Sequence, residues 1–238
     1  MMGRISTGVE GLDEMLQGGL IPGRTYLVKG GPGSGKTTLA VQFIMEGVKN
    51  GEKCLYMTLE ESPKSLKENV AKFGFYLDHP NVMLIDARPG VTDMGDLFLD
   101  DFHAKLTQNF EGMIKSVEEL LQSWEYSRVA IDPITMMKIT LKDELDYRRL
   151  FLRFLEVLDR YNVTALFTAE LISTDIEEYM ASGVIELRTI ETSTGRTLRG
   201  IKITKFRGSG FDDEMRPYSI TERGMEVYSR IGFRETSV

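Results

Sequence analysis

The stretch GGPGSGKTT, Gly30–Thr38, constrains this chain more than any other part of its sequence. It lies between an apolar run and a helical pattern, and it matches G-x-x-x-x-G-K-[ST]. Glycines let the backbone curl so that several N–H groups point at phosphate oxygens, and the start of the following helix adds a positive dipole end. Lys36 would reach the β- and γ-phosphates, and the Thr37 hydroxyl would ligate Mg²⁺. The alternative is a glycine-rich turn without a ligand, which the strand–loop–helix context disfavours. The residues expected to contact a nucleotide are Gly31, Pro32, Gly33, Ser34, Gly35, Lys36, Thr37 and Thr38.

Short apolar runs without polar alternation recur along the chain, as is typical of strands that are covered on both faces. They span Thr25–Gly30, Lys53–Leu59, Val82–Ala87, Arg128–Asp132 and Val163–Thr168. Helical patterns separate these runs, over Lys36–Asn50, Pro63–Phe73, Gly112–Trp124 and Asp143–Tyr161. Strands that alternate with helices predict crossover connections and a mostly parallel central sheet flanked by helices.

The pattern changes after Gly183, where strand-like runs pair across short turns. GVIELRTIE and TLRGIKITKF flank TSTG, and YSITE and MEVYS flank RG. Both pairs predict antiparallel hairpins that extend the sheet at one edge. With 238 residues and no Pro-, Gly- or Ser-rich linker, the chain is expected to form one α/β domain over residues 1–238. The long stretch Arg88–Asn109 has weak periodicity and clustered acids, and we interpret it as a mobile or partner-contacting loop.

Composition excludes several classes of protein. A net charge of -7 argues against a broad basic surface for nucleic acid. Cys54 is the only cysteine, so neither an intrachain disulfide nor a cysteine zinc cluster can form, and His79 and His103 are too isolated for a metal site. No window approaches the roughly 20 apolar residues of a membrane helix, and the first residues lack a secretory signal. We therefore expect a cytoplasmic protein without membrane association.

A phosphate-binding loop of this kind needs an acid on a neighbouring strand to hold the Mg²⁺ shell. Asp132, which ends the apolar run RVAID, is favoured because a long amphipathic helix and another strand follow it. Asp86, which ends VMLID, is the rival. Either residue could instead be an ordinary carboxylate at a strand end.

Hydrolysis also requires a carboxylate that orients or deprotonates the attacking water. Glu60 and Glu61 follow the strand after the loop helix, at the edge where ligands bind in open α/β sheets. Two adjacent acids would repel each other if both were buried, so one should face the phosphates and the other should face outward. The alternative is that they stabilise the dipole of the helix that begins at Pro63.

Four segments together resemble the RecA-like ATPases, and specifically the KaiC/RadA branch. The segment Ser6–Gly47 resembles the family's opening, and Tyr56–Phe75 its catalytic-glutamate segment. RVAIDPIT is similar to its Walker B strand, and TKFRG is similar to its late K-x-R-G segment. The resemblance extends from about Ser6 to about Val227, and it implies a RecA-like P-loop NTPase that uses ATP/ADP and Mg²⁺. ATP rather than GTP rests on this resemblance, because no base-reading motif is visible.

The resemblance also implies roles for particular residues. Glu60 and Glu61 would be the catalytic pair, and Asp132 would hold the Mg²⁺ shell together with Thr37. Lys205 and Arg207 would be catalytic fingers that reach the nucleotide bound by the adjacent subunit of a hexameric ring. Without the resemblance, the charged run KITKFR would be interpreted as a protected edge strand.

The function implied is hydrolysis of ATP to ADP and phosphate at the subunit interfaces of a homo-oligomeric ring, coupled to an unknown protein partner. The chain has one such domain, whereas clock KaiC proteins have two, and it lacks their adjacent Ser-Thr phosphorylation sites.

A DNA-repair ATPase that binds single-stranded DNA is a less favoured alternative. The segment Leu171–Ser182, where such proteins place a DNA-contacting loop, contains three acids and no Lys or Arg. The basic strand residues keep this alternative open; they are Arg196, Arg199, Lys202, Lys205 and Arg207. A non-enzymatic ATP-sensing module is the third alternative.

Overall fold

The computed structural model describes residues 3–89, 109–141, 143–171, 175–191 and 197–229. Within these ranges a nine-stranded sheet has the order β3-β2-β4-β5-β1-β6-β7-β8-β9. The first six strands in that order are parallel, and the last three add antiparallel pairs. The strands are β1 (Thr25–Gly30), β2 (Cys54–Thr58), β3 (Val82–Asp86), β4 (Arg128–Asp132), β5 (Thr164–Ala169), β6 (Gly183–Glu191), β7 (Thr197–Phe206), β8 (Arg216–Thr221) and β9 (Gly224–Val227).

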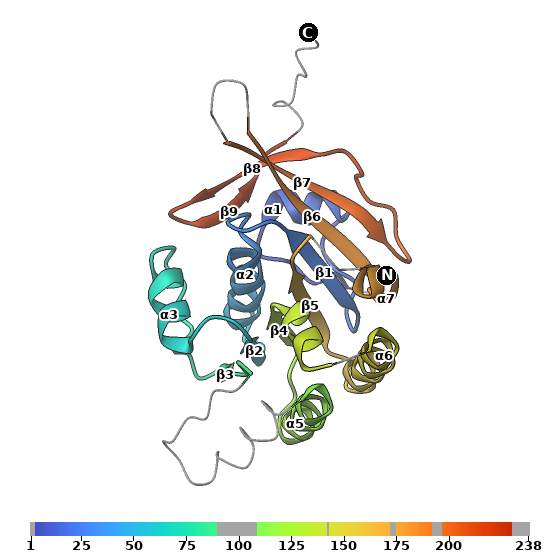
Figure 1. Cartoon of the computed structure of the whole chain (residues 1–238). Coiled ribbons are helices and arrows are strands. Elements are labelled where there is room, and N and C mark those ends of the chain that lie inside the picture. Colours follow the sequence, from blue (N-terminus) through green and yellow to red (C-terminus); the bar gives the residue numbers. More distant parts are fainter. Residues whose placement is uncertain (1–2, 90–108, 142, 172–174, 192–196, 230–238) are drawn as a thin grey trace.

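Helices cover both faces of the parallel part of the sheet (Figure 1). One hydrophobic cluster lies between the sheet and the helices α1 (Glu10–Met15), α2 (Lys36–Lys49) and α3 (Pro63–Ala71). A second lies on the other face, with α5 (Phe110–Ser123), α6 (Glu144–Arg160) and the 3-10 helix η1 (Ile134–Thr140). A short helix, α7 (Asp175–Met180), precedes β6. Because β2, β4 and β5 are buried at every position, their apolar runs show no alternation.

Side-chain caps fix the starts of three helices. Ser62 accepts a hydrogen bond from the Ser65 amide at the start of α3, and Pro63 occupies the first helical position. Asn109 caps α5 in the same way, which is why this helix begins two residues before the expected Gly112. Asp143 caps α6.

The sequence-based expectation of a mostly parallel sheet with C-terminal antiparallel hairpins is confirmed. The five expected parallel strands and four helices are present with ends shifted by at most two residues. The expected hairpins are β6–β7 and β8–β9. The tip of the first hairpin and residues 90–108 lie outside the described residues. The short elements α1, η1 and α7 were not predicted, because six or seven residues are too few to display a period of 3.6. No helix in the described ranges is long and apolar enough to cross a membrane.

Candidate nucleotide site

The loop between β1 and α2 has the backbone of a phosphate cradle. Gly33 and Gly35 have φ angles of 69° and 90°, a region that side chains other than glycine rarely adopt. Within the described part of the chain, the amides of Gly33, Gly35, Lys36 and Thr37 donate no hydrogen bond. These N–H groups lie at the start of α2, and they are available to an anionic ligand.

Lys36 folds back over this loop. Its Nζ donates to the carbonyls of Gly30 at 2.9 Å and Gly31 at 3.0 Å. Burial lowers the pKa of Lys36, and the negative charges of Asp132, Glu170 and Glu60 oppose that shift. The ammonium group therefore lies near three carboxylates at the carboxyl edge of the sheet, where the phosphates of a nucleotide would approach it.

Asp132 is the acid that the fold brings to the loop. Its side chain accepts hydrogen bonds from the Thr37 hydroxyl at 2.7 Å, from the Tyr56 hydroxyl at 2.7 Å, and from the Thr168 hydroxyl. Burial raises the pKa of Tyr56, and the adjacent Asp132 raises it further, so the phenol remains a donor. Asp132 is only 8% exposed.

The rival acid lies elsewhere. Asp86 ends β3 at the edge of the sheet, and its carboxylate forms an ion pair with Arg88 at 2.7 Å. The geometry therefore favours Asp132, as expected from sequence. Tyr56 and Thr168 were not predicted, because only the order of the strands places their hydroxyls on either side of β4.

The two adjacent glutamates have different surroundings. Glu61 accepts hydrogen bonds from Ser65 at 2.6 Å and from the Asn69 side chain, so it is directed toward α3. Glu60 is exposed, and no described residue donates to its carboxylate. Because Thr58 pairs with Asp132 across β2 and β4, Glu60 follows at the same edge of the sheet as Asp132 and close enough to influence Lys36. Glu170, which follows β5, shares this position and was not singled out from sequence.

The C-terminal hairpin β8–β9 packs against the loop between β1 and α2. The Tyr218 hydroxyl donates to the Ser34 carbonyl at 2.6 Å, and Ile220 packs so closely on Gly35 that a Cβ there would lie 2.7 Å from its Cδ1. Arg199 lies beside Tyr218, one position along from the Gly200–Pro217 pair, and its positive charge acts on the Tyr218 phenol. The buried Nε of Arg199 has no hydrogen-bond partner among the described residues. An unpaired guanidinium nitrogen beside the loop indicates a position suited to an anion.

Lys205 and Arg207 lie at the opposite end of the sheet from the loop. Phe206 pairs with Gly183, which pairs with Tyr26, four residues before Gly30 on β1. At about 3.3 Å per residue this is roughly 13 Å along the strand. The backbone at these two cations is therefore offset along the sheet from the loop of their own chain.

The donor set fits a magnesium–nucleotide complex. The Thr37 hydroxyl and the Asp132 carboxylate are neighbouring oxygen donors, which Mg²⁺ prefers, and the free amides and Lys36 suit phosphate oxygens. Among the described residues, no group of three or more His, Cys, Asp or Glu side chains forms an all-protein metal cage. Mg²⁺ in nucleotide sites is held by one or two protein groups together with the phosphates, as Thr37 and Asp132 would hold it here.

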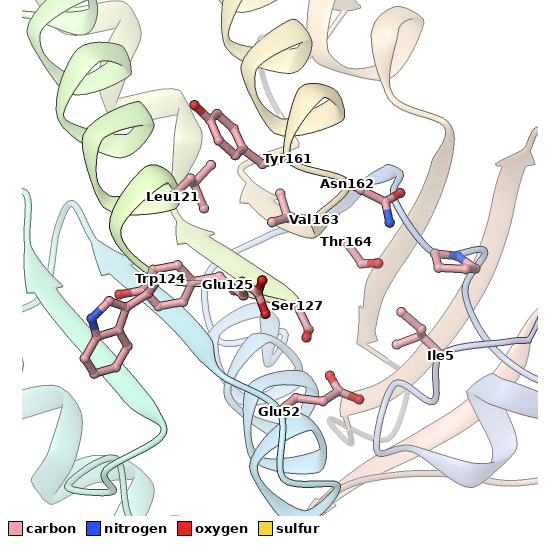
Figure 2. Close-up of a pocket in the computed structure, with 12 residues that line it drawn as sticks. Ile5, Glu52, Leu121, Trp124, Glu125, Ser127, Tyr161, Asn162, Val163 and Thr164 are labelled. Carbon is pink, nitrogen blue, oxygen red and sulfur yellow. The ribbon is translucent and has the colours of Figure 1, made fainter.

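A cavity of about 570 Å³ lies elsewhere, at the amino-terminal ends of β4 and β5. Figure 2 shows the side chains that line it, among them Trp124, Tyr161, Glu52 and Glu125. Both carboxylate oxygens of Glu52 accept hydrogen bonds from the buried Arg128. The cavity contains none of the loop residues, so it is separate from the nucleotide site.

The sheet order, the curled glycine loop and the Thr37–Asp132 contact define a RecA-like P-loop fold that binds a nucleotide. A family model described as "ATPase: KaiC" matches residues 5–231, so the chain belongs to the KaiC ATPase family. The resemblance of the four sequence segments is thereby confirmed.

Similar proteins come from several organisms. The chain is 29% identical over 234 residues to a UPF0273 protein of Methanopyrus kandleri, which covers 94% of this chain and 91% of that protein. It is 30% identical over 239 residues to the circadian clock oscillator protein KaiC of a Picosynechococcus species, covering 94% of this chain but 44% of the clock protein. The crystal structure of a KaiC-like protein from Pyrococcus horikoshii matches with a TM-score of 0.81 and 28% identity, covering 96% of this chain and 100% of that one.

Proposed function

We propose that this protein hydrolyses ATP to ADP and phosphate at sites shared between neighbouring subunits of a ring, and that the cycle acts on a protein partner. The observation that carries the proposal is the placement of Glu60. Its carboxylate has no donor among the described residues, and it lies at the sheet edge beside Lys36 and Asp132. A free carboxylate at this position is what activation of a water molecule requires.

The residues of one chain bind the phosphates, hold Mg²⁺ and activate the attacking water. The loop amides and Lys36 bind the phosphates, and Thr37 and Asp132 hold Mg²⁺. When bound, Mg²⁺ supplies positive charge that offsets the charge of the phosphates. Glu60 accepts a proton from water while the water oxygen bonds to the γ-phosphorus and the bond to the β–γ bridging oxygen breaks. That proton then passes to the released phosphate or to solvent.

The remaining charge is neutralised from the next subunit. Lys205 and Arg207 are about 13 Å along the sheet from their own loop, which supports a role for them at the site of a neighbour. Cations supplied across an interface stabilise charge that develops during phosphoryl transfer and make hydrolysis depend on assembly.

Mixed rings test this shared site. The Arg207→Ala subunit keeps its own P-loop intact, but it lacks a cation that the site of the neighbouring subunit needs. The Lys36→Ala subunit cannot bind the phosphates at its own site, but its Lys205 and Arg207 are intact. Each variant alone should be nearly inactive, and a mixture should regain part of the wild-type phosphate release. If fluorescently labelled subunits are shown to exchange and activity does not return, the shared site is wrong.

Arg199 is assigned to the nucleotide site of its own chain. Replacing it with Gln removes a charge-assisted hydrogen bond, and we expect the affinity for ADP to fall about tenfold or more. Lys202→Gln is the matched control, because Lys202 lies on the same strand with its side chain on the opposite face. Isothermal titration measures both; equal affinities in the two variants would remove Arg199 from the site.

DNA binding remains the less favoured alternative. Within the candidate DNA segment, Glu177 is buried, and Glu178 forms an ion pair with Lys29 at 2.8 Å. The segment therefore supplies acids that are engaged within the chain, and it has no Lys or Arg of its own to contact a phosphate backbone. Stimulation of phosphate release by single-stranded DNA would favour the repair alternative.

A further inference from the structure

The C-terminal end of helix α7 binds the side chains of Lys205 and Arg207, the two proposed catalytic fingers. Lys205 Nζ donates to the carbonyls of Glu178 at 2.6 Å and Tyr179 at 2.7 Å, and Arg207 Nη2 donates to the Tyr179 carbonyl at 2.9 Å. The last carbonyls of a helix lack partners within the helix and carry partial negative charge, so they favour cations. The position of α7 therefore sets the position of Lys205 and Arg207.

The buried carboxylate of Glu177 fixes α7 to the helices α6 and η1. The Glu177 side chain is fully buried. It accepts a hydrogen bond from the Tyr147 hydroxyl on α6 at 2.6 Å, and it forms an ion pair with Lys138 on η1 at 3.0 Å. Burial raises the pKa of Tyr147 well above its usual range, and the Glu177 carboxylate raises it further. Burying a carboxylate costs free energy unless it is paired, so these contacts define one position for Glu177.

The same helix also contacts the strand that leads into the P-loop. Glu178 forms an ion pair with Lys29, the residue before Gly30, at 2.8 Å. Because α7 has only six residues, it is too short to be stable by itself, and its position depends on such tertiary contacts. Of these contacts, the one made by Glu177 is fully buried.

We propose that Glu177 is a positioning residue for the active site of the neighbouring subunit. It fixes α7, and α7 orients the Lys205 and Arg207 side chains that reach that site. This inference rests on the proposed function, in which the two cations act across a subunit interface. It predicts that a Glu177 defect behaves as a finger defect, although Glu177 contacts η1, which follows Asp132 of its own site.

Assignment to a complementation group tests the inference. Glu177→Gln alone should lower the turnover number about ten- to a hundredfold, as misplacement of a catalytic group by about 1 Å does, with affinity for ADP unchanged within about twofold. Mixed with Lys36→Ala, whose fingers are intact, it should recover activity. Mixed with Arg207→Ala, which lacks a finger, it should not.

The opposite pattern overturns the inference. Recovery with Arg207→Ala but not with Lys36→Ala would place the Glu177 defect in its own P-loop site, and wild-type turnover of Glu177→Gln would remove its role. Failure of the Arg207→Ala and Lys36→Ala standard mixture identifies failure of the proposed shared site itself, and the inference falls with it.

Two further variants guard against a general folding defect. Tyr147→Phe removes the same hydrogen bond from the other partner and should fall into the same complementation group with a smaller loss. Asp175→Asn changes an exposed acid on the same helix and should retain wild-type turnover. Thermal unfolding of each variant is followed by circular dichroism, and a turnover loss that simply follows the unfolding temperature, without the predicted recovery, contradicts the positioning role.

Discussion

Replacement of Lys36 by alanine should lower the affinity for ATP and for ADP by about a hundredfold or more. Lys36 is the ammonium group that folds over the loop carbonyls of Gly30 and Gly31, with three carboxylates around it. Without Lys36, those negative charges have no cation to offset them, and they repel the phosphates while the main charge-assisted contact is lost. Titration with a fluorescent ADP analogue measures the effect.

The control for this variant lies on the same helix. Lys49 is at the far end of α2, and its side chain is 76% exposed. Lys49→Ala should bind ADP as the wild type does, which separates loss of a specific contact from a change in net charge. Tight ADP binding by Lys36→Ala would contradict the assignment of the loop as the nucleotide site.

Glu60→Gln should retain nucleotide binding and lose about a hundred- to a thousandfold in turnover. The amide keeps the size of the side chain but accepts a proton poorly, and general-base catalysis typically contributes factors of this size. Steady-state phosphate release gives turnover, and a separate ADP titration shows that binding persists.

Glu61→Gln is the matched variant, one residue away. Glu61 is held by Ser65 and Asn69 on α3, so its loss should loosen the start of α3 and reduce turnover much less. A large loss in Glu61→Gln with a small one in Glu60→Gln would reverse the two roles. Unchanged turnover in a variant that carries both substitutions would exclude the pair.

The parallel sheet could be predicted from sequence because its strands are buried on both faces, which leaves uninterrupted apolar runs such as Arg128–Asp132. Asp132 could be predicted because it ends such a run and because a long amphipathic helix and another strand follow it in the sequence. The roles of Tyr56 and Thr168 could not be predicted, because their contacts with Asp132 depend on the positions of β2 and β5 on either side of β4. Strand order is a property of the folded chain rather than of any local pattern.

The difference between Glu60 and Glu61 was likewise hidden in the sequence. That one should face the phosphates followed from their repulsion, but the choice depends on Ser65 and Asn69, which bind only Glu61. Glu170 was within reach of the same argument, since it is also an acid directly after a buried strand. The role of α7 could not be predicted from sequence, because a six-residue helix shows no helical period and its contacts come from three distant parts of the chain.

Phosphate release from ATP by the wild-type protein, with and without Mg²⁺, tests the central claim most directly. We expect release that requires Mg²⁺, that disappears in Lys36→Ala, and that increases more steeply than the protein concentration, because each site is completed by a neighbour. ATP that binds tightly in the presence of Mg²⁺ and is recovered unhydrolysed would contradict the claim and favour a nucleotide-sensing module.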